Sequence, residues 1–386
     1  MSSIRQLPGL PPLALYVHIP WCVHKCPYCD FNSHAAPSQL PEAEYVQSLL
    51  QDFDNDLSLA AGRPLASIFI GGGTPSLFSA AALEQLINGL AQRIAFASTI
   101  EITLEANPGT FEQERFAAYR SLGINRLSMG VQSFNDRHLK ALGRIHSSSE
   151  ALRAVEIARK AGFDNLNLDL MHGLPNQQHS EAMADLQQAI ELAPEHLSWY
   201  QLTIEPNTAF WSQPPILPED DCLWDIQETG QALLQQHGYA QYEISAYAQP
   251  QRQAQHNLNY WTFGDYLGIG AGAHGKVTLA DGRILRYRKT RQPNAYLANH
   301  SIAGEQWLTD TELPFEYLMN ALRLTQGTAA SLFHERTGLP LIALEPAWQT
   351  AQNKGLMLAD SQRLCTTERG ALFLNDCLQL FLSPQD

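Results

Sequence analysis

The sequence of 386 residues has no apolar run long enough to cross a membrane. Its first apolar stretch, Leu13–Ile19, is short and is interrupted by His18. The opening residues, Met1–Pro12, are polar and rich in proline, so they lack the charged and apolar regions of a signal peptide. These absences predict a cytoplasmic protein with no integral membrane segment.

Positive charge is also scarce. The chain has 25 Lys and Arg residues against 39 Asp and Glu residues, a formal net charge of −14, and its basic residues form no cluster. Such a surface repels nucleic acids and anionic lipids, so we expect neither as a partner. Apolar residues make up 45% of the chain, which is enough for one large core and a smaller attached domain.

Cysteine is rare and unevenly placed. Of six cysteines, three lie within eight residues of one another, at Cys22, Cys26 and Cys29. This spacing is poor for a disulfide framework and typical of a metal site. The cysteines therefore indicate a reducing compartment and a metal-binding loop.

The first half of the chain alternates short apolar runs with amphipathic stretches of helical period. The predicted strands are Leu13–Ile19, Ala66–Ile70, Ile100–Ala106, Arg126–Val131, Leu166–Met171 and Leu197–Ile204. The predicted helices between them are Glu42–Leu59, Ala80–Ile94, Phe111–Leu122, Ser149–Ala161 and Ser180–Leu192. Strands joined by helical crossovers form a parallel sheet. Six such units predict an α/β fold with a partial (β/α)6 TIM-like barrel, and a doubly wound open sheet is the alternative.

The regular alternation ends at a proline-rich loop, Pro206–Asp221. A helix at Cys222–His237 and a strand at Tyr239–Ala248 then complete a core domain predicted for residues 8–250. Residues 251–310 are predicted to form an irregular connecting segment, because their glycines interrupt any helical or strand period.

The last part of the chain, residues 311–386, again shows helical periods. Helices are expected at Phe315–Leu324, Ala329–Thr337 and Ala343–Lys354, followed by a hairpin at Gly355–Thr366 and a short helix. This pattern predicts a C-terminal winged-helix-like α+β domain. Acidic residues outnumber basic ones there, so a structural or protein-binding role fits better than DNA binding.

The cysteines occur in the spacing C-x3-C-x2-C, directly after the first predicted strand. Three thiolates can hold three irons of a four-iron cluster and leave the fourth iron open for a chelating substrate. Pro27 keeps the loop from continuing as a helix. The alternative is a zinc site completed by His18, His24 or His34, although a second cysteine pair is missing.

Polar residues stand at the ends of the predicted strands. Gly71-Gly-Gly-Thr-Pro75 follows the second strand, and Glu105, Gln132 and Asp169 occur in the third, fourth and fifth. Taken singly, each has an ordinary explanation as a tight turn, a helix cap or a solvated side chain. In a parallel barrel the strand ends share one face, so we expect these residues to meet the cysteine loop.

These features together resemble the radical S-adenosylmethionine (SAM) superfamily. The flanking residues resemble its branch of oxygen-independent coproporphyrinogen oxidases (HemN) and heme chaperones (HemW), over nearly the whole chain. The resemblance implies a 4Fe-4S cluster on the three loop cysteines, which cleaves SAM to a 5′-deoxyadenosyl radical. It also implies that residues 8–250 form the radical SAM core. The SAM contacts that it implies are Tyr16, Gly72, Gly73, Thr74, Glu105, Gln132, Arg144 and Asp169.

Within this branch two functions compete, an oxidase that decarboxylates two propionates of coproporphyrinogen and a protein that carries heme. The oxidases have a fourth cysteine two residues after the third, where this chain has Phe31. They also have an N-terminal extension, for which a first cysteine at position 22 leaves no room. Both differences favour the carrier.

The segment His256-Asn-Leu-Asn-Tyr-Trp261 resembles the H-N-x-x-Y-W motif of the heme chaperones. The neutral imidazole of His256 is a suitable axial ligand for heme iron, and Tyr260 and Trp261 offer flat apolar surface. Alone, a histidine beside aromatic residues more often packs in a loop or core. His274, in the glycine-rich segment, is either a second ligand or a packing residue.

We therefore predict a heme carrier rather than an enzyme, with a 4Fe-4S cluster, SAM and heme as cofactors. The resemblance implies delivery of heme to respiratory hemoproteins and a homodimer. The oxygen-independent coproporphyrinogen oxidase is the alternative.

Overall fold

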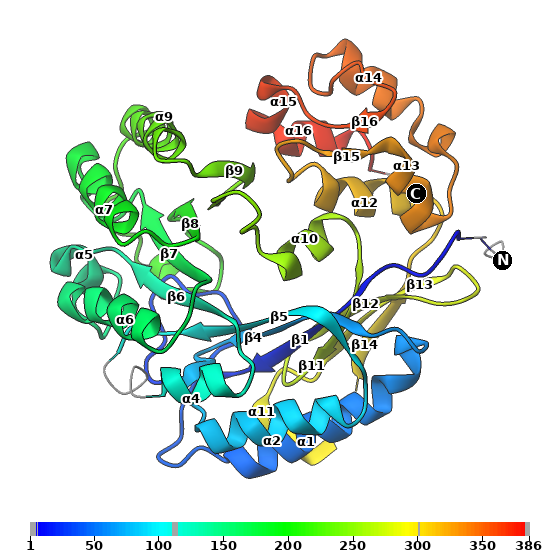
Figure 1. Cartoon of the computed structure of the whole chain (residues 1–386). Coiled ribbons are helices and arrows are strands. Elements are labelled where there is room, and N and C mark those ends of the chain that lie inside the picture. Colours follow the sequence, from blue (N-terminus) through cyan, green and yellow to red (C-terminus); the bar gives the residue numbers. More distant parts are fainter. Residues whose placement is uncertain (1–4, 6, 110–114, 300–301, 383–386) are drawn as a thin grey trace.

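The computed structural model describes residues 5, 7–109, 115–299 and 302–382. Twelve strands form one continuous sheet, which is strongly curved and does not close into a full barrel (Figure 1). In spatial order they are β14 (Ile302–Trp307), β13 (Ile284–Lys289), β12 (His274–Thr278), β11 (Asp265–Ile269), β1 (Leu13–Ile19), β4 (Leu65–Gly72), β5 (Phe96–Ala106), β6 (Arg126–Gln132), β7 (Leu166–His172), β8 (His196–Gln201), β10 (Ala246–Ala248) and β9 (Ala240–Glu243).

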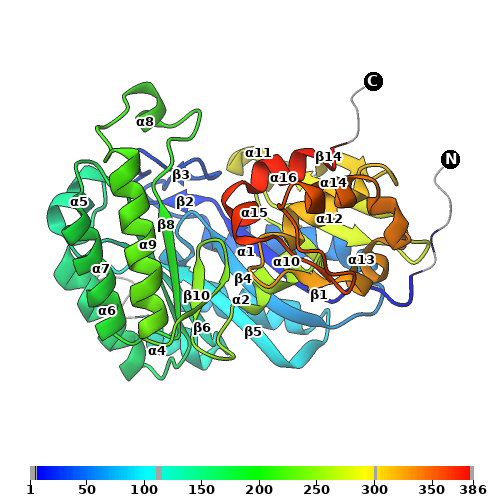
Figure 2. The same cartoon turned by 90° about the horizontal axis from the view of Figure 1, so that it is seen from above.

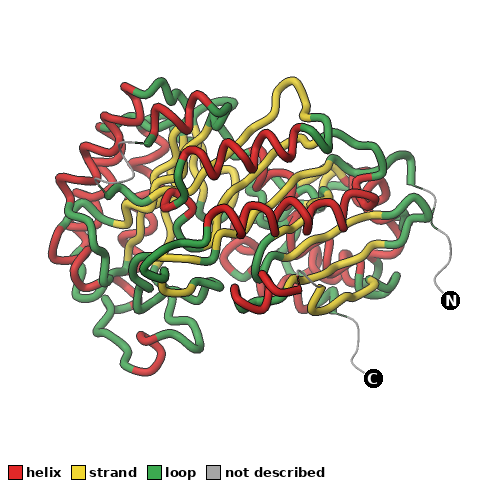
Figure 3. The backbone as a smooth tube through the Cα atoms, turned by 90° about the horizontal axis from the view of Figure 1, so that it is seen from below, coloured by secondary structure: helices red, strands yellow, loops and turns green. Residues whose placement is uncertain are grey.

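The six predicted parallel strands are all present, as β1 and β4 to β8, and they neighbour one another in chain order. This order is that of an incomplete barrel, whereas a doubly wound sheet reverses direction at its centre. Helices cover the convex face of the sheet (Figure 3). They include α1 (Glu42–Asp56), α2 (Ala80–Ala91), α4 (Phe116–Ser121), α6 (Ser148–Lys160), α7 (His179–Glu191) and α9 (Asp220–Gln236). Residues 111–114 of the predicted helix Phe111–Leu122 lie outside the described residues.

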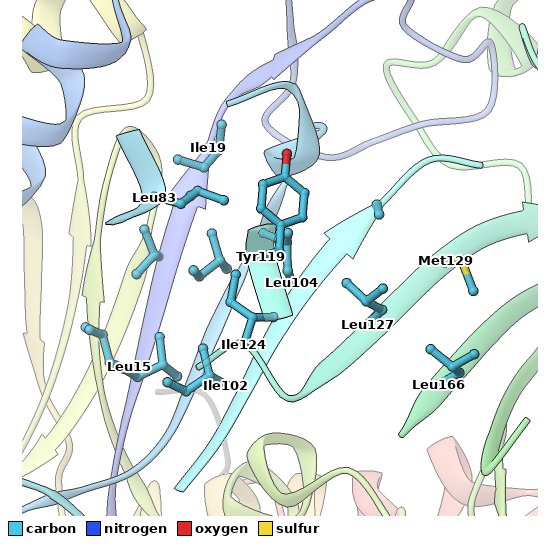
Figure 4. Packing of buried hydrophobic residues seen from close by; sticks show 14 of the residues in the cluster. Leu15, Ile19, Leu83, Ile102, Leu104, Tyr119, Ile124, Leu127, Met129 and Leu166 are labelled. Carbon is cyan, nitrogen blue, oxygen red and sulfur yellow. The ribbon is translucent and has the colours of Figure 1, made fainter. Parts of the chain in front are cut away.

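Alternate residues of each strand face the helices and form the core. Leu15, Ile102, Leu104 and Leu127 are fully or almost fully buried on this outer side, and Leu83 of α2 lies beside Ile19 of β1 (Figure 4). Because the side chains of a strand alternate between its two faces, the intervening residues point to the concave side of the sheet. The same alternation that builds the core therefore sets out the inner wall.

The prediction for residues 251–310 is wrong, because this segment is regular and extends the sheet. It contains α10 (Gln255–Trp261), β11, β12, β13, α11 (Pro293–Asn299) and β14, and β11 pairs in parallel with β1. Gly270 and Gly272 adopt φ values of +104° and +84° between β11 and β12. The glycines thus form a tight turn between two strands, with the exposed His274 at the start of β12. Helix α10 lies on the concave side of the sheet (Figure 1).

The predicted single strand at Tyr239–Ala248 is also wrong, since it is a hairpin of β9 and β10. Its turn is stabilised by Glu243, whose Oε1 accepts hydrogen bonds from the N–H and the hydroxyl of Ser245, both at 2.9 Å. This polar turn interrupts an otherwise apolar run. The hairpin pairs antiparallel with β8 at one edge of the sheet.

The C-terminal part packs around an apolar cluster of its own, which includes Leu318, Phe333 and Trp348. Its elements are α12 (Leu313–Ala321), β15 (Thr328–Ala329), α13 (Ala330–Thr337), α14 (Ala347–Asn353), β16 (Arg363–Leu364), α15 (Glu368–Leu372) and α16 (Leu374–Gln379). Strand β16 pairs antiparallel with β15, so the predicted hairpin at Gly355–Thr366 is reduced to one bridge between Met357 and Thr366.

Shorter elements complete the described chain, and they are β2 (Trp21–Cys22), β3 (His34–Ala35), α5 (Asp136–Ala141), α8 (Ala209–Ser212) and the 3-10 helices at Leu57–Ala60, Pro75–Leu77 and Leu341–Leu344. Across the described ranges, every helix is too short or too polar to span a membrane.

Candidate functional site

A cavity of about 460 Å³ opens at the carboxyl ends of the parallel strands. The short elements β2, β3 and α8 lie together at one end of the molecule, next to the strand β8 (Figure 2). Residues from the cysteine loop and from five strands line the cavity, among them Cys22, Cys26, Cys29, Gly72, Gly73, Thr74, Glu105, Gln132, Arg144 and Asp169. All the residues predicted for the cluster and SAM, except Tyr16, are therefore brought together in one place.

The cysteine loop is held in shape by hydrogen bonds to its own backbone carbonyls. The N–H of Cys29 donates to the carbonyl of Cys26 at 3.1 Å, and Lys25 Nζ donates to the carbonyls of Phe31 and Ser33, each at 3.3 Å. All three cysteines are free thiols and are partly buried. The loop thus presents three thiol groups to the cavity from one compact turn.

Two of the histidines considered for a zinc site, His18 and His34, are hydrogen-bonded within the protein. In the described part of the chain, no three His, Cys, Asp or Glu side chains converge on one ion position. A four-iron cluster spreads its thiolates over different irons and does not need such convergence. His18 is engaged on both ring nitrogens, by the Tyr16 hydroxyl and the Asn32 carbonyl, each at 2.9 Å. His34 contacts the side chain of Asn32 at 3.3 Å.

The glycine run after β4 crosses directly beneath the cysteine loop. The N–H of Gly73 donates to the carbonyl of Ile19 at 2.7 Å, and that of Thr74 to the carbonyl of Trp21 at 2.8 Å. A Cβ atom on Gly73 would lie only 2.5 Å from the Trp21 carbonyl oxygen, and Gly72 has a φ of +117°. Both positions therefore require glycine, because a side chain would push the loop away.

Two partly buried carboxylates, those of Glu105 and Asp169, face the cavity. Glu105 Oε2 accepts a hydrogen bond from the N–H of Gly72 at 2.9 Å. Burial, with a smaller contribution from the charge of Asp169, raises the pKa of Glu105 to about 7 against the lowering effect of that N–H. Asp169 accepts hydrogen bonds from Asn167 at 2.7 Å and Ser128 at 3.3 Å, and burial raises its pKa too. Such carboxylates suit a cationic ligand, which would favour their ionised forms.

Arg144 joins the cysteine loop to the strand ends. Its Nη2 donates to Asn107 Oδ1 and to the Gly130 carbonyl, both at 2.7 Å, and its Nη1 lies 3.6 Å from Cys26 Sγ. Asn107 also donates to Thr74 Oγ1 at 3.1 Å. Arg144 Nε is buried and has no partner among the described residues, so the guanidinium retains capacity for a ligand.

Gln132 ends β6 with a φ of +68°, a conformation that non-glycine residues rarely adopt. Its Oε1 accepts a hydrogen bond from the Tyr200 hydroxyl at 3.0 Å. Sequence reasoning missed Tyr200 and Asn107, although both also line the cavity. Each stands at or just after the end of a strand, so the rule that found Gln132 also applies to them.

Tyr16 lies beneath the cavity instead of lining it. Its ring stacks on Phe69 with a centroid separation of 6.3 Å, and Phe69 in turn lies 5.1 Å from the ring of His256. Tyr16 also lies 6.5 Å from the ring of His256, so the three rings pack as one aromatic cluster. The cluster joins β1 and β4 to helix α10.

His256 is buried in the barrel, with 1% of its surface exposed. Its Nδ1 lies 3.0 Å from Ser67 Oγ, and its Nε2 lies 2.8 Å from the Tyr260 hydroxyl. Burial lowers the pKa of His256 to about 3, so the ring is neutral at physiological pH. Trp261 points elsewhere, with the guanidinium of Arg323 4.5 Å above its ring. The predicted motif is thus split between two faces of α10.

Comparisons with known proteins agree along the whole chain. Residues 16–189 match the model of the radical SAM superfamily, and residues 308–373 match that of the HemN C-terminal domain. The heme chaperone HemW of Escherichia coli (strain K12) is 54% identical over 374 residues, which cover 97% of this chain and 99% of that protein. The heme chaperone HemW of Haemophilus influenzae is 53% identical over 383 residues, covering 98% and 100%. The mitochondrial radical S-adenosyl methionine domain-containing protein 1 of Bos taurus is 33% identical over 392 residues, covering 97% and 88%.

Among solved structures, coproporphyrinogen III oxidase (HemN) from Escherichia coli superimposes with a TM-score of 0.82. The match covers 97% of this chain and 91% of that one at 24% sequence identity, which shows a shared fold and nothing more. The predicted TIM-like partial barrel is confirmed.

Proposed function

This chain belongs to the HemW heme chaperone family of the radical SAM superfamily, and on that premise we propose that it binds heme and delivers it to respiratory hemoproteins. As a radical SAM protein it uses a 4Fe-4S cluster and SAM. We further propose that it works in the cytoplasm as a homodimer.

The observation that carries the heme proposal is the setting of His256. A metal-binding histidine ordinarily donates its second ring N–H to a fixed acceptor, which orients the ring and selects the tautomer. Ser67 Oγ, 3.0 Å from Nδ1, is such an acceptor. In that tautomer Nε2 carries a lone pair, and the Tyr260 hydroxyl donates to it at 2.8 Å. His256 thus becomes an axial ligand for iron when the Tyr260 hydroxyl moves aside.

The ionisation state of His256 supports the same role. Only the neutral imidazole binds iron, and burial keeps the pKa of His256 at about 3. Protons therefore do not compete with iron for Nε2 in the physiological range. The ring packs against Phe69 and Tyr16, and aromatic side chains offer apolar surface that suits a porphyrin.

For the other cofactors, we propose that the three loop cysteines hold the cluster and that the cavity residues hold SAM. The SAM residues are Gly72, Gly73, Thr74, Glu105, Gln132, Arg144 and Asp169, with Tyr16 acting from below the cavity. Support comes from the carboxylates of Glu105 and Asp169 and from the unpartnered Nε of Arg144 within the described residues. Charge-assisted hydrogen bonds of these groups suit the amine and carboxylate of the methionine part.

The carrier is preferred over the oxidase because of Phe31. The position that corresponds to the oxidases' fourth cysteine holds this phenylalanine, which is 61% exposed beside the cavity. No thiol is available there for chemistry on a bound porphyrin.

A paired assay tests the proposal. Hemin added to the anaerobically prepared protein should give a shifted Soret band and a saturable titration at about one heme per chain. The same protein, with reductant and SAM, should not convert coproporphyrinogen. Turnover near the enzyme median of about ten per second, or even a hundredfold slower, would instead establish the oxidase.

A further inference from the structure

Below the cavity, the inner wall of the barrel is polar. On β5 the inward positions are Glu101, Thr103 and Glu105, and on β6 they include Arg126 and Ser128 (strands in Figure 1). Branched apolar residues ordinarily fill the interior of a barrel of parallel strands. Buried polar groups require hydrogen-bond partners, so each of these side chains should have one.

Two of them do not. Thr103 and Arg126 face each other across β5 and β6, and only 0% and 2% of their surfaces are exposed. Among the described residues, Thr103 Oγ1 and Arg126 Nε have no hydrogen-bond partner, and Arg126 forms no ion pair. A buried guanidinium without a partner is strongly unfavourable, whereas one paired with an anion is tolerated.

The two acids nearest to this guanidinium are already engaged. Glu101 Oε1 accepts hydrogen bonds from the backbone N–H groups of Gln255 at 2.9 Å and His256 at 3.3 Å. The carboxylate of Asp169 accepts hydrogen bonds from Asn167 on its own strand and from Ser128 on the neighbouring strand β6. The positive charge of Arg126 lowers the pKa of both acids, against the effect of burial. Arg126 is therefore close enough to act on both carboxylates, although it forms no ion pair with either among the described residues.

The same level of the barrel holds the proposed iron ligand. Ser67, which contacts His256 Nδ1, pairs in register with Glu101 on the neighbouring strand. The charge of Arg126 also acts on the ring of His256, where it adds to the effect of burial in lowering the pKa. A cation, a hydroxyl and an imidazole therefore surround one region of the barrel.

We propose that Arg126 and Thr103 bind a propionate carboxylate of the heme whose iron His256 ligates. The proposal rests on the proposed heme function and assigns the polar half of that site. Heme combines an apolar plane with two carboxylates, and a guanidinium binds a carboxylate through two parallel charge-assisted hydrogen bonds. The Thr103 hydroxyl donates to the same carboxylate. Binding thus gives Arg126, which forms no ion pair with an acid among the described residues, a carboxylate partner.

The test compares ferric heme with its dimethyl ester, in which both carboxylates are masked, on the full-length protein with its cluster. Wild type should bind heme more tightly than the ester by roughly ten- to a hundredfold. Arg126→Gln should abolish this preference, because it weakens heme binding and leaves ester binding unchanged. Thr103→Val, which keeps the side-chain shape, should reduce the preference by roughly two- to tenfold. Arg153→Gln, on the exposed side of α6, is the matched control and should keep it.

Two results overturn the inference while heme binding stands. One is equal weakening of both ligands by Arg126→Gln, which means a structural role. The other is a preference for heme that persists in Arg126→Gln or, should that variant fail to fold, an undiminished wild-type preference in Thr103→Val. Absence of heme binding by wild type would overturn the proposed function and the inference with it.

Discussion

Arg144 and Cys26 are in contact, with 3.6 Å between Nη1 of the guanidinium and the cysteine sulfur. The other end of the same guanidinium is fixed by Asn107 and the carbonyl of Gly130. One side chain therefore ties the cysteine loop to the ends of β5 and β6. The cysteine loop and the cavity are therefore joined, and a change in one should affect the other.

The first prediction concerns this loop. Anaerobically prepared protein should contain about four irons and four sulfides per chain. Cys26→Ala should lose both, together with the brown colour, because each thiolate holds one iron. Cys222→Ala removes a partly buried cysteine on α9 and should keep the full content. Stoichiometric zinc without sulfide in the wild type would contradict the prediction.

The second prediction concerns pH. Burial raises the pKa of Glu105 from its ordinary value of 4.5 to about 7, so the free protein takes up a proton there as the pH falls through 7. SAM is cationic and favours the ionised carboxylate. Binding must then release that proton, and SAM affinity should fall about tenfold between pH 8 and pH 6.

Calorimetry at several pH values on wild type and Glu105→Gln measures this effect. The variant keeps an oxygen acceptor for the N–H of Gly72 but has no proton to lose. Its affinity should be lower at pH 8 and should lack the wild-type dependence. An identical pH dependence in both proteins would show that Glu105 is not the titrating group.

The third prediction concerns access to His256. Tyr260→Phe removes the hydroxyl that donates to Nε2 and keeps the ring. Heme should then bind more tightly by roughly two- to tenfold, which is the range expected from one lost internal hydrogen bond. Tyr266→Phe is the control, since Tyr266 packs on the ring of Tyr260 at 4.5 Å and is not a hydrogen-bond partner of His256. Unchanged or weaker heme binding in Tyr260→Phe would contradict the gating role of this hydroxyl.

The strands and their terminal polar residues could be predicted from the sequence, because both follow from local patterns. Apolar runs of strand length predicted the six parallel strands. The rule that the ends of parallel strands share one face predicted that Glu105, Gln132 and Asp169 lie in one site. Tyr16, which only the family resemblance indicated, is not among the residues that line the cavity, and its hydroxyl bonds to His18.

What could not be predicted depends on contacts between distant segments. The glycine-rich segment looks irregular in sequence, yet Gly270 and Gly272 form the turn that connects β11 to its antiparallel neighbour β12. The partners of His256 come from β4 and from its own helix, and no local pattern links Ser67 to a residue so far along the chain. The unpaired charge of Arg126 appears only once the barrel is assembled.

The most direct measurement is the resonance Raman spectrum of the ferrous heme-loaded protein, prepared with and without ¹⁵N-labelled histidine. Wild type should show an iron–histidine vibration that shifts with the label. His256→Ala should lose that vibration and bind heme at least about tenfold more weakly, and added imidazole should restore the wild-type Soret band. If His256→Ala keeps both the vibration and the wild-type affinity, another residue binds the iron and the account of the heme site is wrong.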